Sequence, residues 1–297
     1  MKIDTHQHYW HYQAEEFPWI SADMPALQCD RMPVDSALPM GAAGVDAAVA
    51  VQARTCSKET DFLLGLARQN PQIVGVIGWA DLAAHDLHAH LQRWSAEPAF
   101  KGLRHILQNE ADVSAWVQAP AHNAGVRDLQ RQAKVYEVLV FEHQMEAVQT
   151  FCRRHDQHWL VLDHIGKPGL RDIQRDLSHW RTQLQALALA PHVLCKLSGL
   201  VTETSEAQRN SPDWPDAHEP LLWACFDTAL EAFGPKRLMF GSDWPVCELA
   251  APYAQVHGVV QAWAESRLST PEQADFWHKN AECCYALEQP HTTTHNP

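Results

Sequence analysis

The sequence predicts a single α/β domain built as a closed barrel of eight parallel strands, the TIM-barrel fold. Eight short apolar runs rich in β-branched residues recur along the chain, and stretches of helical periodicity separate them. Alternating strands and helices form a parallel sheet, and eight strands can close into a barrel. The 297 residues contain no linker-like segment and suit one domain. A doubly wound open sheet is the alternative, but no GxGxxG motif follows the first run.

The predicted strands are the apolar runs themselves. They cover residues 2–8, 47–53, 73–80, 100–106, 137–141, 159–164, 193–198 and 237–243. The amphipathic segments between them include residues 58–69, 86–97, 145–155, 171–189 and 219–233. Glycine or proline marks several of the breaks, as at Pro71, Pro191 and the Gly-Lys-Pro-Gly segment 166–169.

Three further segments complete the predicted organisation. Residues 202–220 are polar and contain three prolines, which predicts a long loop over the mouth of the barrel. Residues 272–287 are predicted to form a closing helix, and residues 291–297 a loose polar tail. We therefore expect the barrel domain to cover residues 1–290.

Composition narrows the class of protein. The 23 basic and 36 acidic residues leave a net charge of −13, which argues against a nucleic acid or an anionic membrane as partner. No apolar run approaches the roughly 20 residues of a membrane helix, and the charged N-terminus does not resemble a signal peptide. The eight cysteines form no CxxC pair and are predicted to be reduced thiols in a cytoplasmic protein. The oligomeric state is not indicated.

Polar side chains occur where each predicted strand ends. Because the active site of a TIM barrel lies at the carboxyl ends of its strands, these residues are predicted to surround one mouth. In chain order they are His6 and His8, Gln52 and Arg54, Trp79 and Asp81, Arg104 and His105, Glu142 and His143, Asp163 and His164, Lys196 and Ser198, and Asp243 with Trp244.

His6 and His8 lie two residues apart on the first predicted strand, so their side chains share one face. Two converging imidazoles suit a divalent metal site. His164 and Asp243, at the ends of other strands, could complete it. The same four groups could equally form an acid/base cluster without metal, and the sequence leaves both interpretations open.

Asp243 follows the apolar run Leu-Met-Phe and a Gly-Ser pair. A carboxylate delivered into a pocket suits a general base that takes a proton from water, although Asp243 could instead cap the turn into Pro245. Arg104, His105 and Lys196 are predicted to polarise a carbonyl and stabilise its oxyanion.

Several motifs together resemble the amidohydrolase superfamily, in particular the lactonases of its amidohydrolase 2 branch. They are DTHQHYW (4–10), KGLRH (101–105), LDHIGKP (162–168), KLSGLVTE (196–203) and FGSDWPV (240–246). The resemblance covers nearly the whole chain and implies a distorted TIM barrel. It also implies that His6, His8, His164 and Asp243 correspond to the metal-binding positions of the superfamily.

The chain departs from the members that bind two metals. Those carry a carboxylated lysine or a glutamate on a middle strand, and a further histidine on the strand after the His164 position. Here that strand offers Lys196, and residues 138–145 contain no lysine, although Glu142 is present. We therefore expect at most one divalent ion, such as zinc, which turnover need not require.

The resemblance implies a hydrolase that opens a sugar lactone to the free acid, with Asp243 as base and then acid. Arg104, His105, His164 and Lys196 would hold the carbonyl. A metal-dependent decarboxylase of the same superfamily and a non-catalytic sugar-acid-binding protein are the alternatives. A dicarboxylate substrate would need several inward cations, whereas tryptophans suit the C–H faces of a sugar ring. Few inward cations and many tryptophans therefore favour a neutral lactone, with L-fucono-lactone as the first choice and L-rhamnono-lactone as the second. The expected substrate-binding residues are Trp10, Trp79, Glu142, Trp214 and Trp244.

Overall fold

The computed structural model describes residues 1–56, 58–172, 174–209, 214 and 219–287. It contains an eight-stranded sheet in which each strand pairs in parallel with the next along the chain. The strands are β1 (Ile3–Gln7), β2 (Ala47–Val51), β3 (Ile73–Gly78), β4 (Phe100–His105), β5 (Val135–Val138), β6 (Leu160–Leu162), β7 (Val193–Leu197) and β8 (Leu238–Phe240). The predicted α/β barrel is confirmed.

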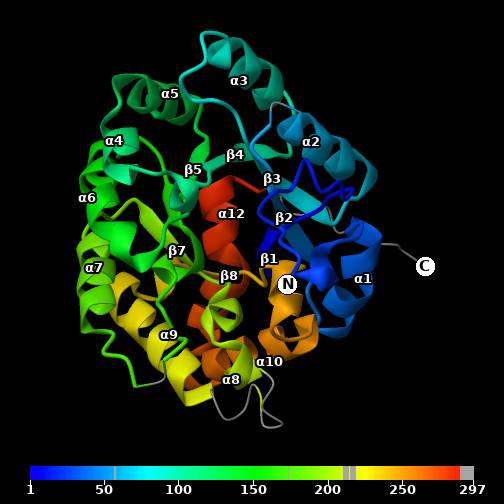
Figure 1. The fold of residues 1–297 in the computed structure, drawn as a ribbon, viewed down its shortest axis with the longest axis vertical. Helices are drawn as coiled ribbons and strands as arrows, with labels where there is room; N and C mark the ends of the chain where they lie inside the picture. Colours follow the sequence, from blue (N-terminus) through cyan, green and yellow to red (C-terminus); the bar gives the residue numbers. More distant parts are fainter. Residues whose placement is uncertain (57, 173, 210–213, 215–218, 288–297) are drawn as a thin grey trace.

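Helices surround the sheet (Figure 1). They are α1 (Pro33–Ala42), α2 (Glu59–Gln69), α3 (Leu87–Ser95), α4 (Val113–Gln118), α5 (Pro120–Arg131), α6 (Met145–Arg154), α7 (Ser178–Ala188), α8 (Glu206–Arg209), α9 (Glu219–Phe233), α10 (Tyr253–Arg267), α11 (Thr270–Ala274) and α12 (Asn280–Tyr285). In α6 the buried residues Met145, Val148, Phe151 and Cys152 form one apolar stripe. Such stripes pack against strands that are buried on both faces, which explains the continuous apolar runs of the sequence.

The barrel closes between β1 and β8, which are joined by a small number of hydrogen bonds. Backbone N–H groups of Asp243 and His8 donate to the carbonyls of His6 and Trp244, at 2.9 and 2.7 Å. The Thr5 hydroxyl donates to the Phe240 carbonyl at 2.6 Å. The seam therefore joins the segment that carries two histidines to the segment that carries Asp243.

The interior of the barrel is a packed apolar core below the mouth. It contains Ile3, Val49, Val135, Leu194 and Met239, which project from the strands. Ala281, Cys284 and Tyr285 of α12 belong to the same cluster, and α12 lies across the centre of the ring of helices in Figure 1. The helix predicted to close the chain therefore plugs the amino-terminal end of the barrel.

Element boundaries differ from the predictions at several places. Strand β5 begins at Val135 and ends at Val138, so the predicted span 137–141 was shifted towards the mouth. The helix predicted over 171–189 forms only at Ser178–Ala188, because Asp172 and Asp176 accept backbone hydrogen bonds in turns that precede it. Within the predicted loop 202–220, residues 206–209 form α8 and α9 begins at Glu219. The predicted tail 291–297 and the domain end at residue 290 lie outside the described residues.

Candidate active site

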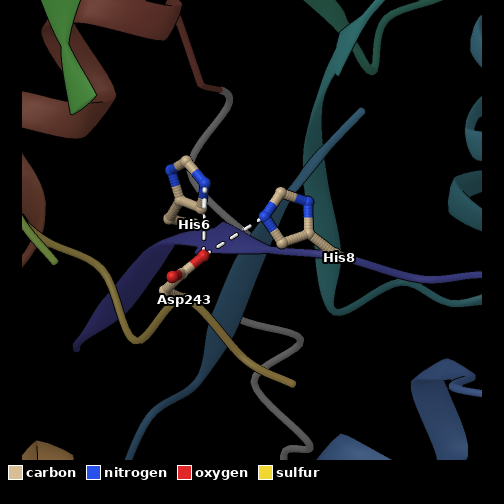
Figure 2. A group of neighbouring side chains, drawn as sticks. All are labelled: His6, His8 and Asp243. Atoms are coloured by element: carbon tan, nitrogen blue, oxygen red, sulfur yellow. Dashed lines mark hydrogen bonds and ion pairs between the residues drawn. The ribbon is translucent and has the colours of Figure 1, made fainter. Parts of the chain in front are cut away.

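Asp243 meets His6 of β1 and His8, which directly follows β1, at the mouth of the barrel (Figure 2). Oδ1 of Asp243 lies 3.2 Å from Nε2 of His8 and 3.7 Å from Nε2 of His6. His164, which follows β6, approaches the same oxygen with its Nε2 at 3.9 Å. All four side chains are buried. The sequence-predicted cluster of three imidazoles and one carboxylate therefore forms in the structure.

Hydrogen bonds to the second nitrogen orient two of these rings. Nδ1 of His8 lies 2.8 Å from the carbonyl of Val51, and since a carbonyl only accepts, Nδ1 must carry a proton. In the neutral ring, Nε2 then carries a lone pair that faces the Asp243 carboxylate. Both atoms are acceptors, so a proton or a metal ion between them would bind to both. Nδ1 of His164 lies 2.8 Å from the Ser198 hydroxyl.

The surroundings keep Asp243 ionised and two histidines neutral. Burial would raise the pKa of Asp243, but its contacts with His164 and His8 and the charge of Lys167 hold it below its usual value. Burial lowers the pKa of His164 and of His6 well below that of a free histidine. At neutral pH the site therefore combines a carboxylate base with neutral imidazoles.

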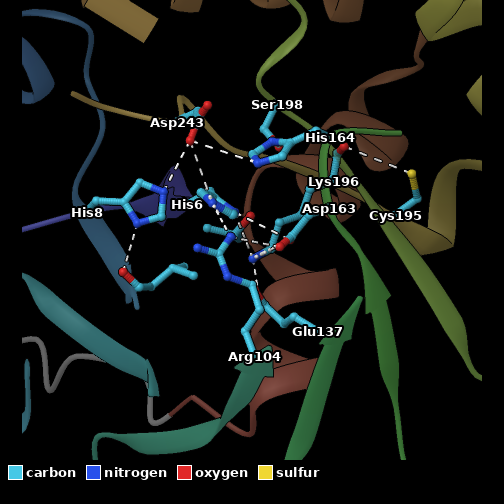
Figure 3. A network of polar contacts seen from close by, with 12 residues as sticks. His6, His8, Arg104, Glu137, Asp163, His164, Cys195, Lys196, Ser198 and Asp243 are labelled. Carbon is cyan, nitrogen blue, oxygen red and sulfur yellow. Dashed lines mark hydrogen bonds and ion pairs between the residues drawn. The ribbon is translucent and has the colours of Figure 1, made fainter. Parts of the chain in front are cut away.

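A buried charge network lies beneath His6 (Figure 3). Nη1 of Arg104 donates to Oδ2 of Asp163 at 3.0 Å. Nζ of Lys196 donates to Oε1 of Glu137 at 2.7 Å and lies 3.3 Å from Oδ1 of Asp163. Two cations thus balance two carboxylates inside the barrel, as buried charges require.

His6 lies between the two cations of this network. Nη1 of Arg104 is 3.1 Å from Nε2 of His6, and Nζ of Lys196 is 3.2 Å from Nδ1. Arg104 also reaches the cavity described next, whereas Lys196 is fully buried and does not line it. In the structure Lys196 therefore contacts His6 and Asp163 and lies outside the cavity lining, a position that does not favour its predicted contact with a substrate carbonyl.

A cavity of about 450 Å³ opens above these residues, within the size range of small-molecule sites. Its floor includes His8, Arg104, His164 and Asp243. Trp19 and Phe141 supply aromatic walls, and Lys167 and Glu203 supply charged ones. Trp19, Lys167 and Glu203 were not among the predicted site residues. Trp19 lies in a loop, Glu203 in a short 3-10 helix that the sequence did not predict, and Lys167 in a Gly-Lys-Pro-Gly segment interpreted as a break.

His105 lies outside the cavity lining, contrary to its predicted role at the carbonyl. Consecutive strand residues point to opposite faces, so when Arg104 points inward, His105 points outward. Its Nε2 lies 2.7 Å from Glu110, its ring stacks on Trp116, and the indole N–H of Trp79 points to its Nδ1 at 3.3 Å. His105 and Trp79 line a neighbouring cavity instead.

The other predicted substrate-binding residues also lie outside the lining of the catalytic cavity. Trp10 packs on Phe17 in a small core of the loop after β1, and its indole donates to Cys29. The indole of Trp244 donates to Glu248, and that of Trp214 donates to Ala250. Glu142 accepts a hydrogen bond from the Gly169 backbone and pairs with Arg175. Each of these side chains has a structural partner.

Comparison with known proteins places this chain in a family. The sequence profile of one family, described as Amidohydrolase, matches residues 3–287. The chain belongs to the amidohydrolase family. The resemblance drawn from the motifs is therefore confirmed.

Two relatives of this amidohydrolase carry the same name. The chain is 49% identical to L-fucono-1,5-lactonase of Burkholderia multivorans, over 98% of the chain and 97% of the relative. It is 30% identical to L-fucono-1,5-lactonase of Burkholderia ambifaria, over 99% of the chain and 98% of the relative. Both alignments span essentially complete chains.

Solved structures agree with the sequence comparison. An amidohydrolase from Burkholderia multivorans, crystallised with bound zinc, is 48% identical and superposes with a TM-score of 0.93, over 97% of this chain and 100% of that one. A probable 2-pyrone-4,6-dicarboxylic acid hydrolase from Acinetobacter baumannii is 15% identical, with a TM-score of 0.76 over 96% of this chain and 99% of that one. The second similarity shows the fold alone.

The donor set of this amidohydrolase fits one divalent ion. Donor atoms of His6, His8 and Asp243 lie within 4.8 Å of one another, and nitrogen and carboxylate oxygen are ligands that zinc accepts. A second group, His6, Asp163 and His164, is equally compact. Two cations, Arg104 and Lys196, already contact Asp163 and His6, which disfavours a second ion there.

Among the described residues, no helix combines the length and the apolar character needed to cross a membrane. All eight cysteines are free thiols, as the sequence predicted.

Proposed function

We propose that this chain hydrolyses a sugar lactone to the free sugar acid, with L-fucono-1,5-lactone as the favoured substrate. The observation that carries the proposal is the 49% identity over 98% of the chain to L-fucono-1,5-lactonase. The site supports it, since a buried carboxylate base and an inward arginine share one cavity.

Asp243 is the proposed proton carrier. Its carboxylate takes a proton from the attacking water as the water oxygen bonds to the lactone carbonyl carbon. When the bond from that carbon to the ring oxygen breaks, the same carboxyl group returns the proton to the ring oxygen. An alkoxide leaving group needs one proton in return, so a single carboxyl group serves both transfers. The products are a carboxylic acid and a free hydroxyl group on one open chain.

Arg104 is the proposed donor to the carbonyl oxygen. Within the described part of the chain, its side-chain N–H groups point to Gln52, Asp163 and His6. These contacts use four of the five N–H groups of a guanidinium. The remaining one can meet the oxyanion, and His164 lies on the same cavity floor to orient the substrate.

Charge balance in the cavity supports a neutral lactone. Lys167 pairs with Glu203 at 3.6 Å, and Arg209 donates to the backbone carbonyls of Thr202 and Thr204. Arg171, a further cation of the lining, also acts on Glu203: burial raises the pKa of this carboxyl, and the charges of Lys167 and Arg171 oppose that rise. A dicarboxylate substrate would need arginines that are free for bidentate contacts. Trp10, Trp79, Trp214 and Trp244 lie outside the cavity lining and do not support the choice of a neutral lactone.

We also propose that His6, His8, His164 and Asp243 can hold one zinc ion, since a relative was crystallised with zinc. When bound, such an ion would act as a Lewis acid. The free thiols lead us to propose a cytoplasmic location.

A panel of lactones with a pH indicator tests the function, with each spontaneous rate subtracted and with and without a chelator. We expect acid release from L-fucono-lactone, less from L-rhamnono-lactone, and little from 2-pyrone-4,6-dicarboxylate. A preference for the dicarboxylate would reject the neutral substrate. Absence of acid release from every lactone would reject the function and favour a binding protein, and carbon dioxide release from aromatic acids would indicate a decarboxylase.

A further inference from the structure

The segment after β6 forms a left-handed turn of four consecutive residues. The φ angles of His164, Ile165, Gly166 and Lys167 are 53°, 45°, 69° and 48°. A residue other than glycine in this region costs about 1–2 kcal/mol, and a β-branched residue such as isoleucine adopts it rarely. Strain of this kind persists where surrounding contacts hold it, and it is concentrated at functional sites.

Several contacts hold the turn in place. The Lys167 backbone N–H donates to the His164 carbonyl at 2.8 Å, and the Trp180 indole donates to the Ile165 carbonyl at 2.8 Å. The Ile165 side chain is fully buried. The turn brings both His164 and Lys167, three residues apart, to the wall of the catalytic cavity. The proposed catalysis uses His164, whereas it leaves Lys167 without a role.

Lys167 faces a carboxylate across a short gap. Its Nζ lies 3.6 Å from Oε1 of Glu203, and each side chain is 17% exposed. This distance exceeds that of a normal hydrogen bond, so both groups keep directions in which a ligand can bind. The Lys167 ammonium also lies 5.3 Å from the centre of the Phe141 ring, which fixes it beside an aromatic wall. The pair therefore offers a donor and an acceptor at adjacent points of the cavity.

We propose that Lys167 and Glu203 select lactones with two neighbouring hydroxyl groups, the ammonium donating to one hydroxyl and the carboxylate accepting from the other. This inference rests on the proposed lactone hydrolysis. Two adjacent ring hydroxyls match a donor and an acceptor separated by one short gap, whereas an unsubstituted lactone leaves the ammonium and the carboxylate only each other to contact. Specificity then comes from two partly buried charged groups that gain hydrogen bonds only from the hydroxylated ring.

Two variants and a series of substrates test the pair. The variants are Glu203→Gln, on a segment of right-handed backbone, and Lys167→Asn, chosen because asparagine tolerates the left-handed region. The substrates are L-fucono-1,5-lactone and its monodeoxy analogues, each lacking one ring hydroxyl. We expect kcat/KM on the parent lactone to fall roughly 10- to 100-fold in each variant, the range for a hydrogen bond to a charged group.

The analogues distinguish recognition from a structural role. If Lys167 reads a given hydroxyl, removal of that hydroxyl slows the wild-type enzyme, and Lys167→Asn then slows the same analogue little further, because the contact is already lost. The same non-additivity is expected for Glu203→Gln at the neighbouring hydroxyl. A loss below about fivefold on the parent lactone, or an equal loss on every analogue, would overturn the inference.

Lys279→Met is the matched control, since it removes an exposed lysine whose Nζ lies 3.8 Å from Asp275, next to α12 and outside the cavity lining. It should leave kcat/KM unchanged on every lactone. If Lys167→Asn does not fold, by circular dichroism, Glu203→Gln alone decides. If the wild-type enzyme opens no lactone, the proposed function is wrong. If the wild-type enzyme is active and both variants keep its kcat/KM, only the inference about Lys167 and Glu203 is wrong.

Discussion

Asp243 depends on a backbone conformation that few residues other than glycine adopt. Its φ angle is 61°, and its backbone N–H donates to the His6 carbonyl at 2.9 Å. Together these turn the carboxylate towards the cavity and the three imidazoles. Since asparagine tolerates the left-handed region as well as aspartate does, a charge-neutral replacement preserves this geometry.

Asp243→Asn should therefore abolish turnover and retain binding. We expect kcat to fall about 100- to 10,000-fold, the usual cost of losing an acid/base group, while the Kd for the sugar acid, measured by calorimetry, changes little. Asp176→Asn, at an exposed turn, is the control and should be fully active. Folded Asp243→Asn enzyme with more than about a tenth of wild-type activity would exclude Asp243 as the base.

Lys196 supports the site from within the barrel. Burial raises the pKa of Glu137, and Lys196 supplies the neighbouring positive charge, with Nζ 2.7 Å from Oε1 of the carboxylate. Tyr285 of α12 donates to the same oxygen at 2.7 Å. Loss of the ammonium would leave buried carboxylates without a partner.

Lys196→Met should lower the free energy of unfolding by about 3–5 kcal/mol, as measured by urea denaturation. Lys196→Met combined with Glu137→Gln should recover part of this loss, because the second change removes one unpaired charge. An unchanged unfolding free energy together with a collapsed kcat would instead restore the role predicted from the sequence, a direct contact with the substrate carbonyl.

At the scale of elements, the left-handed turn 164–167 depends on its glycine. Gly166 has a φ of 69°, and a Cβ there would lie 2.3 Å from Sδ of Met145 in α6. Any side chain at this position therefore meets both backbone strain and a packed neighbour.

Gly166→Ala should destabilise the protein by more than the roughly 1–2 kcal/mol of left-handed backbone strain, with reduced kcat because His164 shifts. Gly258→Ala is the matched control. Gly258 lies within α10, where a Cβ meets nothing within 4 Å, so alanine should raise stability by up to about 1 kcal/mol. Thermal unfolding of the two variants measures both effects, and equal shifts would contradict this account of the turn.

At the scale of the whole molecule, the number of metal ions that the protein binds depends on which side chains the barrel brings together at its mouth. After incubation with excess zinc and desalting, elemental analysis should find at most one tightly held ion per chain. His8→Gln should reduce this content, whereas His88→Gln, which removes an exposed histidine paired with Asp128, should not. Close to two ions per chain would show that Arg104 and Lys196 do not prevent a second site.

Much of the site could be predicted because strand ends are local features of a sequence. The alternation of apolar runs and helices predicts the barrel, and the barrel then gathers His6, His8, His164 and Asp243 at one mouth. Spacing along a strand also predicts that His6 and His8 share a face. These inferences need the order and period of residues, not their packing.

Which side chains line the cavity was decided by the tertiary structure alone. Arg104 points into the barrel, so its neighbour His105 points outward. Lys196 is buried and contacts Glu137 and Asp163, and the four predicted tryptophans pack outside the cavity lining. Lining by Trp19, Lys167 and Glu203 depends on short segments after the strands, where the sequence shows neither strand nor helix periodicity. The sequence by itself determined the barrel and the carboxylate with its histidines, because these follow from periodicity and strand ends, and its motifs indicated the family by resemblance. The cavity walls required contacts between residues far apart in the chain.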